Sequence, residues 1–351
     1  MVKKSLACSI ACLGLLVSAA VPRLSVAADG SGPFEVAETI HIGGPGNFDY
    51  VTVDRRDKRL YIPRTTHTQV VDLTTGKVVA DIEGQQGNHG VALNRQAGRG
   101  FISDGPGFVV IFDTKTDSVL GRVKVDRGAD GIINDSATKK VYVACGGAGS
   151  LVPVPVDVDP TNGKADPAIE LGGKPEGLAS DGQGKIYVNL EDKEQVAVVD
   201  AKAGKVVDRW SVAPGGAPVG MAIDAKNHHL FVGCRKPAKL IVINTEDGHV
   251  LADLPIGTGC DATAFDSGTI FASCGDGTLN IARETSPGKF EIIQNLKTRP
   301  RAKTMAVDRS THTVYLPTAE YPEAAAGGGR RGRPRAKPDT FMVVVVKPVQ
   351  K

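Results

Sequence analysis

A short motif of small and apolar residues that ends in Asp or Asn recurs along the chain and limits the folds open to it. It reads "KPEGLASD" at 174–181, "APVGMAID" at 217–224 and "GCDATAFD" at 259–266. Its last residue recurs every 40 to 46 positions, at Asp54, Asn94, Asp135, Asp181, Asp224, Asp266 and Asp308. A period of this length with strand-like content is typical of a β-propeller or a repeat array.

Each repeat has an internal pattern that predicts four strands. The motif is a first strand of small residues, and an alternating strand such as "RGFIS" or "KIYVN" follows a polar turn. A third, apolar strand such as "VAVVD" leads through a turn such as "KAGK" to a fourth strand such as "VLADLPI". Gly supplies the positive φ that such a hairpin turn needs. Seven such units without an amphipathic helix predict an all-β fold, a seven-bladed β-propeller with four antiparallel strands per blade.

The two ends of the chain are expected to meet in one blade. The seventh unit stops at its third strand, "TFMVVVVKP" (340–348), and one strand, "FEVAETIHI" (34–42), is left over before the first unit. We therefore expect the N-terminal strand to join the last blade and close the ring, which removes an open sheet edge. Residues 28–351 are then expected to form one propeller domain.

The units at 173–207 and 217–257 resemble YVTN-type β-propeller repeats. They read "GKPEGLASDGQGKIYVNLEDKEQVAVVDAKAGKVV" and "APVGMAIDAKNHHLFVGCRKPAKLIVINTEDGHVLADLPIG". Essentially all of 34–349 is similar to the YncE-like exported propeller proteins. This resemblance implies the fold and an extracytoplasmic compartment. It implies no activity, because propellers carry many unrelated functions.

Residues 1–27 have the pattern of a secretory signal peptide. Lys3 and Lys4 precede an apolar run, and small residues suit cleavage after Ala27. The run is short for a membrane span, and no later run is long and apolar enough for one. The sequence therefore predicts a periplasmic or secreted protein without a transmembrane anchor. A net charge of +3 also argues against a protein that binds polyanions over its whole surface.

The residue before the small Gly or Ala of each motif is expected at the mouth of the central channel, because the first strands converge on the axis. Around the ring these residues are Asp49, His89, Asp130, Glu176, Val219, Asp261 and Lys303. The repeat stays similar while the charge at this position changes. This is expected of a scaffold that carries a site at its mouth.

Three interpretations of the mouth stay open. In the first, the charges satisfy one another with water. In the second, a divalent cation such as Ca²⁺ binds to four carboxylates, since hard cations take several oxygen ligands; these are Asp49, Asp130, Glu176 and Asp261. In the third, a metal-bound water or a carboxylate base attacks a small ester or lactone, and His89 moves protons.

The ends of the second strands should reach the same face and add candidates for a binding rim. These residues are Arg64, Asp104, Asn189 and Arg235. Most of the rim is expected to be solvated, with some side chains available as ligand contacts.

Four cysteines remain after the predicted signal peptide, and two of them suggest a disulfide. Cys260 begins the first strand of the sixth unit and Cys274 ends the second, so an antiparallel hairpin places them side by side. An oxidising compartment would permit the bond. Cys234 is a competing partner for Cys260, and no CxxC spacing indicates zinc or haem.

An Arg-, Gly- and Pro-rich segment at 319–339 interrupts the seventh unit and is expected to be a flexible loop. Its basic residues are Arg330, Arg331, Arg333 and Arg335, followed by Lys337. "RGRP" resembles an AT-hook core, which would imply DNA binding in the minor groove. A contact with an anionic envelope polymer, or a flap over the acidic mouth, fits an exported protein better.

The sequence thus favours a binding or interaction module that uses its channel mouth and has no catalysis of its own. Its partner would be a small molecule or an envelope protein. The alternative is a metal-assisted, lactonase- or esterase-like hydrolase centred on the axial carboxylates.

Overall fold

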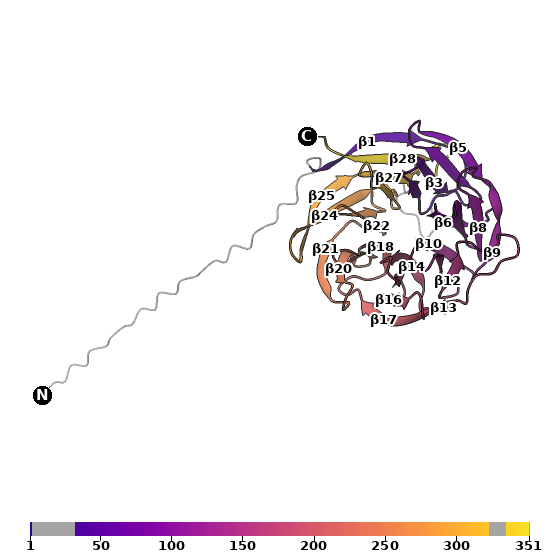
Figure 1. Cartoon of the computed structure of the whole chain (residues 1–351). Coiled ribbons are helices and arrows are strands. Elements are labelled where there is room, and N and C mark those ends of the chain that lie inside the picture. The colour runs from indigo at the N-terminus through magenta and orange to yellow at the C-terminus, as the bar shows by residue number, and fades with distance from the viewer. Residues whose placement is uncertain (2–31, 323–334, 351) are drawn as a thin grey trace.

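The computed structural model describes Met1, residues 32–322 and residues 335–350. Seven four-stranded antiparallel sheets stand around a central axis like the blades of a propeller (Figure 1). All regular elements in these residues are strands. The predicted all-β, seven-bladed propeller is therefore confirmed. The described residues contain no helix with the length and apolar character of a membrane span.

In each of blades 1 to 6 the four strands follow one another outward from the axis. Blades 1 to 3 consist of β2 (Thr52–Asp54), β3 (Arg59–Pro63), β4 (Thr68–Asp72), β5 (Lys77–Ile82); β6 (Asn88–Asn94), β7 (Arg99–Asp104), β8 (Phe108–Asp113), β9 (Val119–Lys124); and β10 (Ala129–Asp135), β11 (Lys140–Cys145), β12 (Ser150–Pro155), β13 (Ile169–Glu170). Blades 4 to 6 consist of β14 (Pro175–Ser180), β15 (Lys185–Leu190), β16 (Gln195–Asp200), β17 (Lys205–Ser211); β18 (Pro218–Asp224), β19 (His229–Arg235), β20 (Ala238–Asn244), β21 (Val250–Pro255); and β22 (Cys260–Asp266), β23 (Thr269–Cys274), β24 (Thr278–Ser286), β25 (Lys289–Lys297).

Blade 7 joins the two ends of the chain, as the sequence predicts. It consists of β26 (Ala306–Asp308), β27 (Thr313–Thr318), β28 (Met342–Pro348) and the N-terminal β1 (Phe34–His41), which pairs with β28. Phe34 also reaches blade 6. Its N–H donates to Gln294 Oε1 at 3.1 Å, and its ring packs edge-on against Phe271. The N-terminal strand therefore stabilises the junction between two blades as well as the blade that it completes.

The Asp or Asn that ends each first strand closes a turn, which explains why the motif repeats it. Asp135 Oδ2 accepts the N–H of Thr138 at 2.8 Å, and Asp308 Oδ1 accepts that of Ser310 at 2.8 Å. Side-chain acceptance of a backbone N–H two or three residues on is the usual role of Asx residues in turns. The repeated carboxylate at this position is thus structural and lies at the opposite end of the strand from the channel mouth.

The outer strands carry a recurrent irregularity that protects the sheet edges. In six blades the register of the fourth strand shifts by one residue, for example between Val70 and Val71 opposite β5. Val79, the extra residue in β5, keeps 52% of its surface exposed. A bulge twists an edge strand away from regular pairing and so opposes edge-to-edge aggregation.

Candidate functional site

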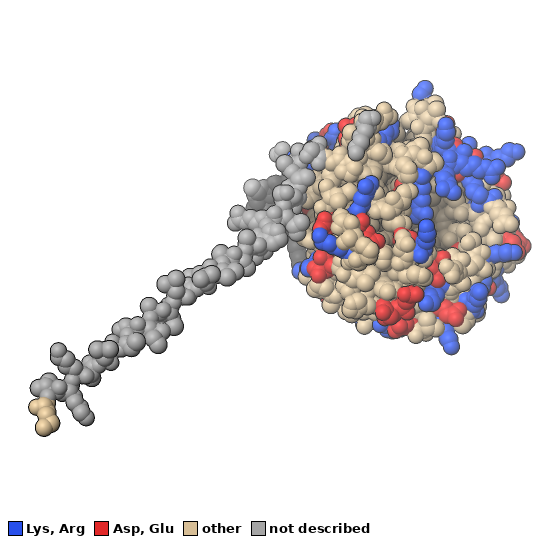
Figure 2. Space-filling view, turned by 60° about the vertical axis from the view of Figure 1, so that its left-hand side comes forward, with Lys and Arg blue, Asp and Glu red and all other residues tan. Residues whose placement is uncertain are grey.

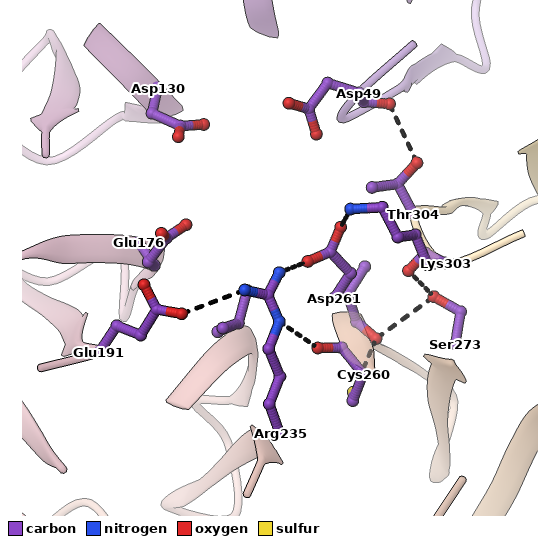
Figure 3. Close-up of polar contacts among 12 residues, drawn as sticks. Asp49, Asp130, Glu176, Glu191, Arg235, Cys260, Asp261, Ser273, Lys303 and Thr304 are labelled. Atoms are coloured by element: carbon purple, nitrogen blue, oxygen red, sulfur yellow. Dashed lines mark hydrogen bonds and ion pairs between the residues drawn. The ribbon is translucent and has the colours of Figure 1, made fainter. Parts of the chain in front are cut away.

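Each mouth residue of blades 2 to 6 lies in a β-bulge of the inner strand. The pairing skips from Asn88 to Val91 in β6 and from Ala129 to Ile132 in β10, so the residues between them have no regular partner. Corresponding shifts occur in β14, β18 and β22. Bulges re-aim side chains and are common beside functional sites. The repeat therefore brings the mouth positions around a common centre, as Figure 3 shows for Asp49, Asp130, Glu176, Asp261 and Lys303.

Side chains of neighbouring blades hold the backbone of this ring in place. Ser103 at the end of β7 donates to the carbonyl oxygen of Asp130, and Ser273 of β23 donates to that of Lys303 at 2.5 Å. Asn189 of β15 donates to the carbonyl oxygen of Val219 at 3.0 Å. In each contact, a side chain of one blade thus fixes the backbone of the mouth residue in the next blade.

Asp49, His89 and Asp130 form one cluster at the mouth, here called the acidic arc. His89 Nδ1 lies 2.8 Å from Asp49 Oδ2 and 3.7 Å from Asp130 Oδ1. One potential ligand atom from each residue lies within 4.8 Å of the other two. The side chains keep 26%, 36% and 27% of their surface exposed, so a small ligand has access from solvent.

The acidic arc has a negative potential that shifts the pKa values of its members. Burial opposes protonation of His89, but its hydrogen bond to Asp49 and the charge of Asp130 raise the pKa of His89 to about 9. Burial, with repulsion from Asp49 and Glu176, raises the pKa of Asp130 to about 7. The same acids and burial raise the pKa of the neighbouring Tyr50 well above its usual value. A group that adds positive charge here is therefore favoured.

The remaining charges of the mouth pair with one another in a second group, here called the paired arc (Figure 3). Asp261 accepts from Arg235 Nη2 and Lys303 Nζ. Arg235 Nη1 also lies 3.1 Å from Glu191 Oε1. Lys174 Nζ then bridges Glu191 Oε2 at 2.5 Å and Glu176 Oε1 at 2.6 Å. This chain of ion pairs neutralises its own carboxylates.

The four carboxylates proposed for a cation therefore divide between the two arcs. The structure brings Asp49 and Asp130 together with His89, whereas Glu176 pairs with Lys174 and Asp261 with two cations. Val219 contributes a fully buried apolar side chain to the ring.

Three of the four rim candidates have buried side chains that make internal contacts. Arg64 is 0% exposed, donates to the carbonyl oxygens of Gly43 at 3.1 Å and Asn47 at 3.1 Å, and stacks on the Phe341 ring. Asp104 accepts backbone N–H groups, and Asn189 holds the Val219 carbonyl. These contacts use the polar groups of the three side chains inside the protein, and a role in ligand binding stays a prediction for them. Arg235 does lie at the mouth, within the paired arc.

Sequence reasoning missed Lys174 and Tyr50. Lys174 comes two residues before Glu176, so its place beside the mouth could have been inferred from the motif. Tyr50 occupies the position that is Gly or Ala in five of the other six units, an exception visible in the alignment of the repeats. It lines the channel just below Asp49.

The four cysteines of the described residues are free and buried. Cys260 and Cys274 are direct partners in the β22–β23 pairing, and contact with Cys260, together with burial, raises the pKa of Cys274 far above its usual range. The structure thus places the two thiols side by side without the expected bond, and the disulfide stays a prediction.

Two predictions fall on residues that the structure leaves undescribed. The signal peptide at 1–27 lies outside the described residues, apart from Met1, as do Arg330, Arg331 and Arg333. Arg335 is exposed, and Lys337 Nζ lies 3.3 Å from Glu320 Oε2 across the base of the segment. On the face shown in Figure 2, basic and acidic side chains are interspersed. Polyanion or DNA binding by this segment stays a prediction.

Comparison with known proteins supports the family resemblance. The YncE proteins of Escherichia coli K12 and O157:H7, both described as uncharacterized, are 29% identical over 223 residues, which are 59% of this chain and 62% of theirs. YncE of Salmonella typhi is 26% identical over 161 residues, 42% of this chain and 44% of that protein. The match thus spans less than two thirds of the relatives' length.

No family model matches the sequence. Among solved structures, a chain of Kuenenia stuttgartiensis hydrazine synthase aligns with 75% of this chain and 99% of its own, at a TM-score of 0.47 and 14% identity. A likeness at this level carries no argument about function. The chain is thus a seven-bladed β-propeller whose sequence is similar to that of the YncE proteins.

Proposed function

We propose that the protein is a binding module that takes a positively charged ligand at the acidic arc. The observation that carries this proposal is the unsatisfied hydrogen-bonding capacity of the Asp130 carboxylate. Its Oδ1 atom is inaccessible to solvent and has no hydrogen-bond donor among the described residues. A buried carboxylate oxygen without a donor is costly and needs a partner. Asp49 and His89 hold further ligand atoms within 4.8 Å of it.

The contrast with the paired arc supports a positive charge on the ligand. There, every carboxylate is already matched by Lys174, Arg235 or Lys303. Within the described residues, the ion pairs of Asp49 and Asp130 are to His89 alone. A cation at the acidic arc would complete a ring of paired charges.

A divalent metal ion fits this donor set as one form of such a ligand. The carboxylates of Asp49 and Asp130 supply hard oxygen donors, and His89 would supply a ring nitrogen once the bound ion had displaced its proton. A bound ion would act there as a fixed positive charge and a Lewis acid.

Thermal unfolding tests the proposal. The melting temperature is measured in CaCl₂, MgCl₂ and methylammonium chloride, against NaCl at equal ionic strength. We expect at least one cation to raise it progressively, because a ligand that binds only the folded state stabilises by RT ln(1 + [L]/Kd). Asp130→Asn should abolish the rise.

The matched control is Asp253→Asn, which removes an acid that pairs with Lys239 on an outer strand. This variant should keep the full response to the cation. The proposal fails if no cation stabilises the protein, or if the response survives Asp130→Asn unchanged.

A metal-assisted hydrolase is the second candidate. One observation favours it: the pKa of Asp130 is raised to about 7 beside His89, a combination suited to general acid–base catalysis near neutral pH. A panel of small esters and lactones, assayed with added divalent metal and with chelator, tests it. Turnover that Asp130→Asn removes would support a hydrolase, and its absence across the panel would leave the binding module.

We also propose that the protein acts outside the cytoplasm, as the pattern of residues 1–27 suggests. Fractionation of bacterial cells that express the full chain tests this proposal. The mature protein should begin at Ala28 and leave the cytoplasm. An uncut chain in the cytoplasm would contradict it.

A further inference from the structure

A ring of aliphatic side chains lies in the channel directly below the acidic arc. The cavity there has a volume of about 180 Å³, and Tyr50, Thr52 and Asp261 contribute polar groups to its wall. The ring itself consists of residues two positions after the mouth residues: Val51, Val91, Ile132, Leu178, Met221 and Met305. The seventh such position is Thr263, the single hydroxyl in this layer. A volume of this size equals about six water molecules at ~30 Å³ each. The mouth is therefore charged and the layer beneath it is aliphatic.

The cavity continues toward the opposite face of the propeller. A second cavity of about 340 Å³ shares four lining residues with it, Ile133, Met221, Thr263 and Met305. The walls of the second cavity are mixed: Phe265 and Val307 are apolar, whereas Asn134, Ser180 and Arg309 are polar. An elongated molecule that enters at the mouth thus meets the aliphatic ring first and a mixed surface deeper in the channel.

We propose that the ligand of the acidic arc is a primary alkylammonium ion whose chain fills this channel. The inference rests on the proposed function and names its ligand class. An –NH₃⁺ group has three donors and no acceptor. Asp130 Oδ1 lacks a donor, and the Asp49 carboxylate lies beside it. The charged head is thus matched at the mouth.

The layer under the arc favours an organic cation over a bare metal ion. A hard divalent cation takes six or more oxygen ligands. In the ring below Asp49 and Asp130, six of the seven side chains are aliphatic and the seventh is Thr263, so the ring suits methylene groups better than a hydrated metal ion. Transfer of each methylene from water into such surroundings is favourable.

A series of ligands on the unaltered protein tests the inference. Calorimetric titration with methyl-, butyl- and hexylammonium chloride gives three dissociation constants at neutral pH, where all three amines are protonated. We expect affinity to rise about fourfold for each methylene that becomes buried. Hexylammonium carries the same head group as methylammonium, so a gain in affinity along the series measures burial of the alkyl chain.

Met221→Gln makes the channel wall polar at nearly constant side-chain length. We expect this variant to lose most of the gain with chain length, measured as the ratio of its affinities for hexyl- and methylammonium. Val119→Gln, a polar substitution at an exposed position of β9, is the matched control and should keep the full gain. If Met221→Gln does not fold, the dependence of affinity on chain length in the unaltered protein still tests the alkylammonium assignment.

The outcomes separate this inference from the proposed function. Equal affinity for the three amines, or binding of Ca²⁺ alone, would overturn the alkylammonium assignment and leave the cation site standing. Binding of none of these cations would overturn both. A gain with chain length that also persists in Met221→Gln would place the chain outside the channel and overturn the inference.

Discussion

Asp130 and Asp261 occupy the same position of the repeat, in blades 3 and 6, yet their surroundings differ completely. The next mouth residue after Asp261 is Lys303, whereas after Asp130 it is Glu176. The second strand of the preceding blade adds Arg235 beside Asp261, and the equivalent residue in blade 2 is Gly105. The repeat therefore fixes where a carboxylate lies, and two neighbours from other blades decide whether it is neutralised.

The largest effect should come from breaking the paired arc. Asp261→Ala removes a buried carboxylate, 2% exposed, that both Arg235 and Lys303 contact. We expect a loss of about 3 kcal/mol in the free energy of unfolding, measured by urea denaturation. Asp130→Ala should change it by less than about 1 kcal/mol, because that carboxylate is poorly satisfied. Equal losses would show that the two arcs do not differ in this way.

Oxidation of Cys260 and Cys274 to a disulfide should stabilise the folded protein next to the paired arc, whereas the acidic arc has no such cysteine pair. A Cys260–Cys274 bond closes a loop of 15 residues immediately next to Asp261. Such a loop stabilises by about 3 kcal/mol in the chain-entropy view, less any strain. Protein prepared with and without reductant is compared by thiol counting and by urea denaturation, with Cys274→Ala as the control. Four free thiols after exposure to an oxidant would contradict the pairing.

The pH dependence of stability should reveal the raised pKa of Asp130 in the acidic arc. Burial raises the pKa of Asp130 to about 7 in the folded protein, whereas an unfolded Asp titrates near pH 3.9. Between these values the folded protein keeps a proton that the unfolded chain has lost. The free energy of unfolding therefore falls as the pH rises from about 4 to 7 and then levels off. We expect Asp130→Asn to remove about 2 kcal/mol of this fall, because the partly exposed side chain is screened by water.

The control for the pH experiment is Asp253→Asn, which should keep the dependence of the unaltered protein. Urea denaturation at several pH values provides the measurement. An Asp130→Asn curve parallel to that of the unaltered protein would mean that Asp130 titrates normally.

The smallest effect should come from giving the acidic arc a basic neighbour like those of the paired arc. Glu176→Lys gives Asp130 the kind of neighbour that Lys303 gives Asp261. We expect the affinity for the proposed cation to fall about tenfold, since the added charge competes with the ligand for the same carboxylate. Calorimetric titration measures it. Glu176→Gln separates the loss of the acid from the gain of the base and should lower the affinity less.

Much of the fold could be predicted because its determinants are local in the sequence. The period of the Asx-ended motif, the alternation in the second strands and the unpaired strand at each end predict the blades and their closure, and the structure confirms them. The mouth positions followed from the same repeat. The roles of Arg64, Asp104 and Asn189 could not be predicted this way, because an end-of-strand position does not reveal that a loop from elsewhere covers it.

The sequence by itself determined the number of blades, the circular closure and the ring of positions at the mouth, since each depends on a pattern that repeats along the chain. The tertiary structure decided which acids are paired. Lys303 and Asp261 are 42 residues apart, and Arg235 and Asp261 are 26 apart. Their contacts arise only when neighbouring blades pack around the axis. Electrostatic energy depends on distances of a few ångströms, which the order of residues alone does not provide.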